Sequence, residues 1–428
     1  MIRSFIQKLN KIPAYLNWKM DEFIFYLIKT KSEKESIQTT IKKYAFLIKL
    51  TGHKASTFNN IDLYGHEKEI SKEKKSHTKI YKPHLYGDDK PKEKYFLEKE
   101  VRIKHFTNSY VYSRTSLVFD ENKTVNLEYN YTNSNYLVFK DLYINGVIND
   151  HVLYKNIKAK EIKIEKGISL LGKGSWNYFH MMFEYLPKLA YIQEDISDYT
   201  ILVDADYKNY DAFKYLIPKI FKGDICYIAN DESVFVQNLI YVTTPFYLAF
   251  NKTCAYELED MRYNNKIIDW IKKLNLILEK DASIKAFELK KYKKIFLTRD
   301  NNKSRNYNSE EIAKIAQDHG FQMVDLSNHT LLEQYLIMKN VDFFIGPTGA
   351  SLTNIIFCKA GTTGITWMHD AWGDFPVYST LSKIVGIELR YLKVESRSER
   401  YSGEYHLESN YFLRALENIN AAKKARMH

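Results

Sequence analysis

Residues 341–354 read VDFFIGPTGASLTN, and they carry the strongest indication of the fold. The apolar run VDFFI is typical of a buried strand, and the apolar run that follows residue 354 is typical of a helix. The segment between them holds the glycine, proline and serine of a tight strand-to-helix turn. In open parallel sheets, ligands bind beside such turns because the N-termini of helices present N–H groups to anions.

The residues of this turn suit a phosphate group. Gly349 allows the backbone to approach an anion closely, and Ser351 is the predicted N-cap of the helix. The amides of Ser351, Leu352 and Thr353 would then face the ligand. The alternative is an ordinary turn of glycine and serine that caps a helix, and the turn residues fit both interpretations.

Strands and helices alternate on both sides of this stretch. Between 293 and 386 the pattern predicts strands at 293–300, 321–326, 341–346 and 363–368, each followed by a helix. A similar alternation between 176 and 244 predicts a second half, and a long helix at 255–279 joins the two. Such alternation builds βαβ units and parallel sheets. The predicted fold class is α/β, with two Rossmann-like domains facing across a cleft.

The N-terminal third has a different pattern. Helices are predicted up to residue 50, a lysine- and glutamate-rich polar connector up to residue 95, and short strands between 100 and 165. The predicted divisions are 1–95 (helical arm and charged connector), 96–255 (first α/β domain), 256–290 (interdomain helix or linker), 291–390 (second α/β domain) and 391–428 (C-terminal tail or helix).

Composition limits the function. The 428 residues include 63 Lys and Arg against 52 Asp and Glu, a net charge of +11 that attracts nucleic acid, anionic lipid or small anionic substrates. Lysine is favoured over arginine, which argues against nucleic-acid readout. Three cysteines without paired spacing indicate neither a zinc site nor a disulfide framework, and a reducing compartment is expected.

The N-terminal arm is the segment that could contact a membrane. Its longest apolar run, FIFYLI at 23–28, is far shorter than the roughly 20 residues that cross a membrane. Its mixture of basic and aromatic residues suits the surface of an anionic membrane. The alternative is that the helix packs on its own domain.

The stretch GKGSWNYFHMMFEYLPKL at 172–189 holds the first candidate site. Asn177, His180 and Glu184 are spaced three and four residues apart, so they share one face of a helix and could present a general base to a hydroxyl group. Lys188 falls on the same face, and a Glu184–Lys188 pair is also typical of a solvated surface. Pro187 is expected to end the helix nearby.

The second candidate site is FLTRDNNKSRNYNSEE at 296–311. Arg299 and Arg305 follow a predicted strand of the same half as the opening stretch, and two guanidinium groups could bind a diphosphate. The alternative is that both are solvated loop residues. Asn308 and Ser309 are the predicted cap of the next helix, with Glu311 at the capping-box position.

Other sites are weakly supported. The sequence has no GxGxxG after a first strand, no Walker loop, no GxSxG and no HExxH. YGDDK at 86–90 pairs two carboxylates but lies in the charged connector, where turn chemistry is the simpler interpretation. No metal site is predicted.

Four segments in one order resemble glycosyltransferase family 61: NYFHMMFEYLPKL, IFLTRDNNKSRNYNSEE, Gln334 in LLEQYL, and GPTGASLTN. The resemblance covers about 170–370. The chain departs from the family pattern at Thr348, where relatives commonly have histidine, and at Ser351, where they have glycine. The first departure removes a charged or hydrogen-bonding group near the donor, so the identity of the donor, or the activity itself, is left open. The second departure keeps a capping residue but narrows the turn.

The resemblance implies a GT-B fold and inverting, metal-independent transfer from a nucleotide sugar, commonly a UDP-sugar. In that interpretation the diphosphate is held by Arg299, Arg305 and the segment Thr348, Gly349, Ala350, Ser351 and Leu352. Glu184 is the first choice as base, with His180 as the alternative or its partner. The supporting residues are Asn177, Asn308, Gln334 and Asn354.

The acceptor implied by the resemblance is a polysaccharide or glycolipid, as in capsule or lipopolysaccharide synthesis at the cytoplasmic face of a membrane. No cofactor beyond the donor and no nucleic-acid partner are expected. The alternative is a nucleotide-binding protein that keeps the fold and has a scaffold or binding role.

Overall fold

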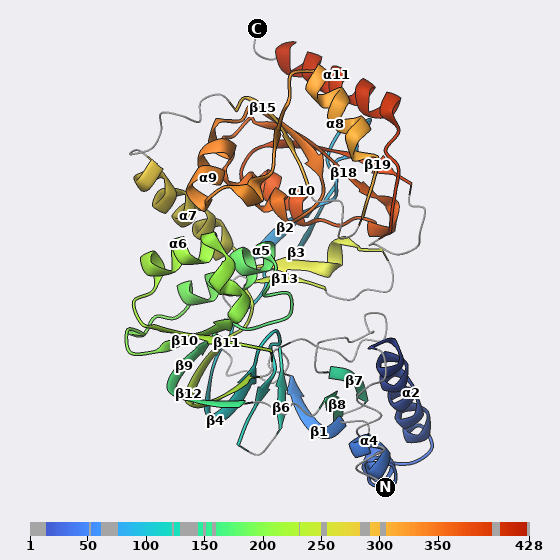
Figure 1. The fold of residues 1–428 in the computed structure, drawn as a ribbon, viewed down its shortest axis with the longest axis vertical. Coiled ribbons are helices and arrows are strands. Elements are labelled where there is room, and N and C mark those ends of the chain that lie inside the picture. Colours follow the sequence, from blue (N-terminus) through green and yellow to red (C-terminus); the bar gives the residue numbers. More distant parts are fainter. Residues whose placement is uncertain are drawn as a thin grey trace.

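The computed structural model describes residues 14–50, 53–60, 76–121, 124–128, 144–148, 151–155, 160–230, 232–249, 255–282, 292–299, 305–395 and 403–425. The protein is elongated and has two sheet-containing halves along its long axis (Figure 1). The C-terminal half is at the top of that view, and the N-terminal helices lie at the bottom. The α/β fold class predicted from the sequence is confirmed, with a mixed sheet in the N-terminal half.

The C-terminal half is built on one parallel sheet. Its strands, in spatial order, are β16 (Gln322–Val324), β15 (Lys294–Leu297), β17 (Phe343–Pro347), β18 (Thr363–His369) and β19 (Glu388–Val394). Numbered along the chain, this order is 2-1-3-4-5, and its direction reverses between β15 and β17. Ligands of doubly wound folds bind outside the carboxyl ends of the strands at such a reversal.

Helices cover both faces of this sheet. One face packs against α8 (Ser309–Asp318) and α11 (Ser409–Ala425). The other packs against α9 (Leu331–Asn340), the 3₁₀ helix η7 (Ala350–Phe357) and α10 (Val377–Ile384). Strand β19 is not among the predicted strands, whereas α11 lies in the predicted C-terminal tail or helix and packs on α8.

The N-terminal half has a ten-stranded mixed sheet. Its parallel part consists of β11 (Asp224–Ile228), β10 (Thr200–Asp204), β9 (Lys160–Ser169) and β12 (Glu232–Val242). It continues through β4 (Ile103–Tyr112), β5 (Val118–Phe119), β6 (Val125–Leu127), β1 (His53–Asn60), β8 (His151–Lys155) and β7 (Ile144–Ile148). Strands β9 and β12 end side by side, because Tyr241 pairs with Ser169.

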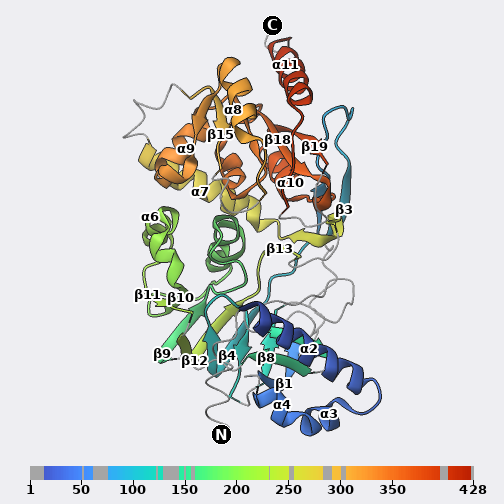
Figure 2. The ribbon, with the colours of Figure 1, turned by 45° about the vertical axis from the view of Figure 1, so that its right-hand side comes forward.

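The N-terminal helices are α2 (Ala14–Ser32), α3 (Ile37–Lys43) and α4 (Ala45–Leu50), as the sequence predicts. They lie beside β1 and β8 (Figure 2). Ile24, Ile28, Ile37 and Ile48 form a small separate core with Leu153 of β8. In the part of the chain that the structure describes, no helix combines the length and apolar character needed to cross a membrane.

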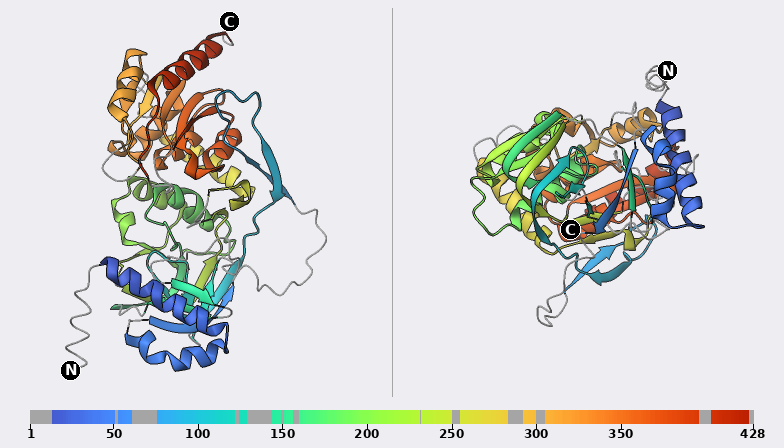
Figure 3. Two further views of the ribbon diagram at one scale, coloured as in Figure 1. Left: turned by 90° about the vertical axis from the view of Figure 1, so that its right-hand side faces the viewer. Right: turned by 90° about the horizontal axis from the view of Figure 1, so that it is seen from below.

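The predicted polar connector contains strands instead. Besides β1, residues before 98 form a hairpin of β2 (His77–Tyr81) and β3 (Glu93–Leu97). Its charged residues pair across the strands, as Lys79 does with Glu93 at 2.8 Å, while Ile80 is fully buried. This alternation of buried and charged residues suits a half-buried strand. Figure 3 shows the hairpin along the side of the C-terminal half.

Two predicted helices differ from the structure. The helix predicted at 255–279 is α7 (Lys266–Ala282), because Met261–Tyr263 pair as strand β14 with β13 (Phe246–Leu248). The helix predicted at 176–192 is a succession of α5 (Tyr178–His180), the π-helix η2 (Met181–Tyr185) and the 3₁₀ helix η3 (Leu186–Ala190). Pro187 lies in the first turn of η3, where its missing N–H group would have no partner inside the helix.

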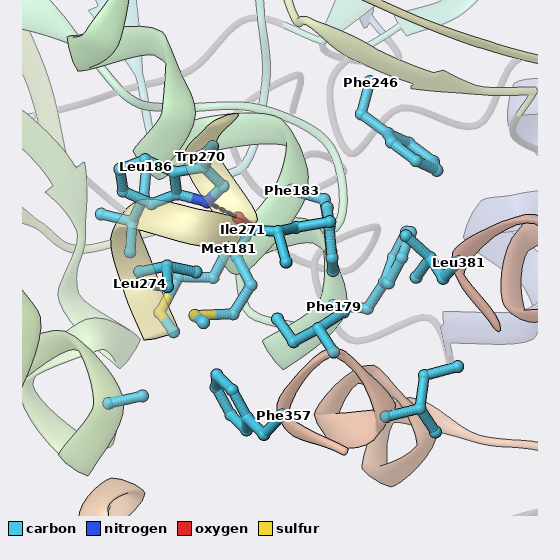
Figure 4. Close-up of a cluster of buried hydrophobic side chains, with 14 of the residues drawn as sticks. Phe179, Met181, Phe183, Leu186, Phe246, Trp270, Ile271, Leu274, Phe357 and Leu381 are labelled. Carbon is cyan, nitrogen blue, oxygen red and sulfur yellow. Dashed lines mark hydrogen bonds between the residues drawn. The ribbon is translucent and has the colours of Figure 1, made fainter. Parts of the chain in front are cut away.

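The two halves share one hydrophobic core. Figure 4 shows Phe179 and Phe183 of the first half in one cluster with Phe357 of η7 and Leu381 of α10. The Trp270 indole of α7 donates a hydrogen bond of 2.9 Å to the Met182 carbonyl. The succession α5–η2–η3 therefore lies packed at the junction of the two halves.

Candidate active site

His180 and Glu184 form the centre of the first cluster. The His180 Nδ1 atom lies 2.8 Å from Glu184 Oε1, across one helical turn. The Glu184 side chain is fully buried, whereas 12% of the His180 side chain is exposed. Burial raises the pKa of the Glu184 carboxyl above its ordinary value, and the adjacent imidazole opposes this shift. A substrate at this site would meet His180 first, which favours the second of the two sequence-based assignments of the base.

A second buried ion pair lies behind this dyad. Lys188 Nζ is 3.9 Å from Glu128 Oε2, and both side chains are buried. Glu128 also accepts hydrogen bonds from the Tyr241 hydroxyl at 2.6 Å and from the Thr244 amide. The solvated Glu184–Lys188 face weighed as an alternative is therefore wrong. Glu128 is not among the residues predicted from the sequence, because no motif marks it and it follows β6, a strand far from Lys188 in the sequence.

The loop between β9 and α5 holds His180 in place. A Cβ atom on Gly174 would lie 2.8 Å from His180 Cδ2, and Gly174 has a φ of +78°. The backbone therefore packs directly against the imidazole edge that lies away from Glu184. Asn177 is the N-cap of α5, where its side chain accepts a hydrogen bond of 2.9 Å from the Phe179 amide. Asn177 thus orients the helix locally.

The second cluster lies at the carboxyl ends of β15 and β17. The Arg299 and Arg305 guanidinium groups both donate to the Thr348 carbonyl, at 3.4 and 3.2 Å. Arg299 also donates to the Arg305 carbonyl, and Arg305 has a φ of +57°. The sequence prediction that these arginines gather beside the opening stretch is confirmed, and they lie at the point where the strand order reverses.

The turn after β17 differs in detail from the prediction. Gly349, rather than Ser351, is the N-cap of η7, and no side chain caps this helix. The helix is 3₁₀, so the Leu352 amide donates to the Gly349 carbonyl at 3.0 Å and is used inside the helix. Ala350 and Ser351 are half-buried in its first turn, whereas Leu352 is fully buried.

Thr348 points into the sheet. Only 4% of the residue is exposed, and its hydroxyl lies 3.1 Å from the Thr366 hydroxyl of β18. Its amide donates to the Trp367 carbonyl at 3.0 Å. The main-chain carbonyl of Thr348 therefore faces the arginines, while its side chain contacts the neighbouring strand β18.

Aromatic groups surround the arginines. The Arg305 guanidinium lies 5.2 Å from the Trp372 ring centroid, and Tyr307 stacks on Tyr405 at 5.4 Å. Asn308 precedes α8 but makes no side-chain cap. Its amide group instead exchanges two hydrogen bonds of 3.0 Å with the Leu407 backbone. Asn308 therefore anchors the C-terminal segment.

The two clusters are joined by side chains of the junction. The Tyr178 hydroxyl donates a hydrogen bond of 2.9 Å to Asn354 of η7, and Asn354 donates one of 3.0 Å to Gln334 of α9. Gln334 in turn donates to the His329 carbonyl at 2.9 Å. Asn354 lies about 10 Å along η7 from Gly349, at roughly 2 Å of rise per residue. The structure thus brings together all four segments singled out in the sequence.

The described residues contain no group of three or more His, Cys, Asp or Glu side chains arranged to hold a metal ion. The carboxylates of YGDDK lie in the turn between β2 and β3, where Gly87 has a φ of +100°.

A known protein family matches the part of the chain that holds these two clusters. The family model described as Glycosyltransferase 61 matches residues 178–365. A search of curated proteins gives no match. The matched range begins at the tyrosine that contacts Asn354 and includes both arginines, Gln334 and the turn after β17.

Proposed function

Because residues 178–365 form a glycosyltransferase family 61 domain and this chain is a glycosyltransferase, we propose that it transfers a sugar from a nucleotide donor with inversion at the anomeric carbon. The observation that carries the proposal is the pairing of two chemically different clusters at one junction. A buried carboxylate supports a partly exposed imidazole on one side, and two guanidinium groups converge on a turn on the other.

In this mechanism His180 is the general base. As the acceptor oxygen bonds to the anomeric carbon, its proton moves to the imidazole, and the bond from that carbon to the diphosphate oxygen breaks. Glu184 contacts Nδ1, so it fixes the orientation of the ring and stabilises the imidazolium that forms. The raised pKa of Glu184 reflects the cost of a buried charge, and a protonated His180 offsets that cost.

Arg299 and Arg305 serve the leaving group in this proposal. Both guanidinium groups contact the Thr348 carbonyl, and planar forks of this kind bind diphosphate oxygens bidentately. They would stabilise the charge that develops on the departing nucleoside diphosphate, commonly UDP in this family. The Gly349 backbone lies beside them, since a Cβ atom added to Gly349 would lie 3.9 Å from Arg299 Cδ. The two halves would correspond to the two domains of a GT-B enzyme.

The acceptor in this proposal is a polysaccharide or glycolipid handled in the cytoplasm at the inner face of a membrane. The N-terminal helices expose Phe23, Tyr26 and Phe46, each by more than half, together with Lys29 and Lys49. Exposed aromatic and basic side chains suit the interface of an anionic membrane. Co-sedimentation with vesicles containing anionic lipid, compared with neutral vesicles, tests this part.

The central experiment is a panel of nucleotide sugars incubated with the purified chain, with and without isolated surface glycans. Release of the free nucleoside diphosphate together with a product of inverted anomeric configuration, read by NMR, is the expected result. Retained configuration would contradict the single-displacement mechanism.

The second candidate is a nucleotide-binding protein with altered catalysis. Thr348 favours it, because its buried side chain offers no group to a donor where relatives commonly have histidine. Binding of UDP by calorimetry without turnover of any donor in the panel would support this candidate.

A further inference from the structure

Trp176 lies four residues before His180, in the loop between β9 and α5, and 40% of the residue is exposed. The other large apolar residues that are exposed in the described part of the chain lie away from this loop, at Phe23, Tyr26, Phe46, Tyr95, Leu97, Ile103 and Leu276. An exposed indole in the loop that leads into α5 offers a flat apolar surface to a ligand with an apolar face.

Hydrogen bonds to a buried carboxylate fix the loop that carries Trp176. The Ser175 hydroxyl donates to the Gly172 carbonyl at 2.7 Å and to the Asp204 carboxylate. Asp204 is 1% exposed and also accepts hydrogen bonds from the Ser113 hydroxyl at 2.7 Å and the Arg114 amide at 2.6 Å. One buried carboxylate therefore ties Ser175, the residue before Trp176, to the segment that follows β4.

Arg114 sets the surroundings of the indole. Its guanidinium lies 5.0 Å from the Trp176 ring centroid and pairs with Asp206 at 2.5 Å. Arg114 has a φ of +56°, a backbone conformation that is unfavourable for arginine. Residues with such backbone conformations are found preferentially at ligand sites. The result is an aromatic surface with a hydrogen-bond donor and an acceptor beside it.

We propose that Trp176, Arg114 and Asp206 form a subsite for a neutral pyranose ring of the acceptor glycan. The C–H face of the sugar would pack on the indole, and its hydroxyl groups would bond to the guanidinium and the carboxylate. A neutral sugar fits best because Arg114 and Asp206 offset each other's charge, so a sugar acid would gain little from the Arg114 guanidinium. This inference rests on the proposed function, since it concerns the acceptor of that transfer, and Trp176 precedes His180 by four residues in the same loop-and-helix segment.

The test is a binding experiment that needs no donor. The full chain is labelled with 5-fluorotryptophan, and the Trp176 resonance is assigned by its loss in Trp176→Phe. Methyl glycosides of glucose, galactose and N-acetylglucosamine are titrated, with methyl glucuronide as the charged comparison. A concentration-dependent shift of the Trp176 resonance with a neutral glycoside, weaker in Asp206→Asn and with the glucuronide, is expected. A resonance unmoved by every neutral glycoside would overturn the subsite.

Kinetics separate this inference from the proposed function. With the acceptor found in the donor panel, Trp176→Ala is expected to raise the acceptor KM about tenfold while kcat and UDP affinity stay near wild type. The matched control is Tyr95→Ala, which removes an exposed aromatic residue from β3. An unchanged acceptor KM in Trp176→Ala would contradict the subsite but not the proposed function. Full transfer by His180→Ala would contradict the proposed mechanism, and the glycoside titration would still show whether Trp176 binds sugar.

Discussion

The Tyr178 hydroxyl donates a hydrogen bond of 2.9 Å to the Asn354 side chain, and this bond joins the two halves of the enzyme at the junction of their clusters. Tyr178 lies two residues before His180, and Asn354 lies on the helix that begins beside the arginines. Burial raises the pKa of the Tyr178 phenol, so the hydroxyl keeps its proton and remains the donor. The two residues therefore hold the proposed base and the proposed donor site in a fixed relation.

Tyr178→Phe is expected to lower the free energy of unfolding by about 1–3 kcal/mol, because it leaves the fully buried Asn354 without one partner. Urea denaturation checks this. Tyr26→Phe is the control, since Tyr26 is 72% exposed and should change nothing. Equal unfolding midpoints for Tyr178→Phe and wild type would contradict the prediction.

His180→Ala is expected to lower kcat by roughly 10²–10⁴-fold, the usual contribution of a general base. The affinity for UDP should stay unchanged, because His180 is on the acceptor side of the junction. Steady-state kinetics and calorimetry together check both parts. Glu184→Gln should abolish most transfer as well, and a near wild-type rate in that variant would exclude Glu184 from the dyad.

Glu184→Gln should also change how stability depends on pH. Burial raises the pKa of Glu184 above its ordinary 4.5, so the folded state holds the proton more tightly than the unfolded state. The stabilisation from this group is complete below pH 4.5 and is lost as pH rises through the folded pKa. Glutamine does not titrate, so the stability of the variant relative to wild type should increase from pH 5 to pH 8. Urea unfolding at several pH values checks this, and a constant difference would contradict it.

Arg305→Lys keeps the positive charge but removes the planar fork. We expect UDP affinity to fall by about tenfold or more, since hydrogen bonds to charged groups contribute roughly 1.5–3 kcal/mol each. Arg299→Ala should weaken binding as well. Calorimetry with UDP checks both, with Arg390→Lys as a control because Arg390 pairs with Glu388 on the outer strand of the sheet. Unchanged affinity would remove the substituted arginine from the donor site.

Gly174→Ala tests the contact between the loop and His180. The new Cβ would lie 2.8 Å from the imidazole Cδ2, so the ring must shift from its present position. Gly320→Ala is the matched control, because Gly320 has nearly the same φ, +80°, and no atom within 4 Å of the added Cβ. Both variants should lose roughly 1–2 kcal/mol of stability, because alanine is unfavourable in a left-handed backbone conformation, but only Gly174→Ala should lose transfer activity. Equal activities would show that the contact is unimportant.

Much of the C-terminal half could be predicted from the sequence. The periodicity of α8 and α9 and the apolar runs of β15, β17 and β18 are local signals, and the structure confirms them. Short strands at a sheet edge carry weaker signals. The hairpin of β2 and β3 was predicted as connector because its lysines and glutamates look solvated, although they pair across the strands.

The candidate site could be predicted only in part. The i,i+4 spacing of His180 and Glu184 is visible in the sequence, and so are the arginines after one strand. Glu128 is not, because its contact with Lys188 depends on how a distant strand lies in the sheet. The capping error at Ser351 has a local cause, since η7 is a 3₁₀ helix that begins two residues earlier than the apolar pattern suggests.

The hairpin of β2 and β3 also sets the order of events during synthesis. The Tyr81 amide bonds to the Thr380 hydroxyl, a partner 299 residues later in the chain, and Leu85 bridges to Tyr391 of the last strand. At about 5–20 residues per second, the ribosome needs roughly 15–60 s to deliver that partner. Strand β14 becomes available to the hairpin during this interval, but the part of the hairpin's buried face that packs on α10 stays uncovered. A chaperone that engages nascent chains early would protect Ile80 and its neighbours until the C-terminal sheet is complete.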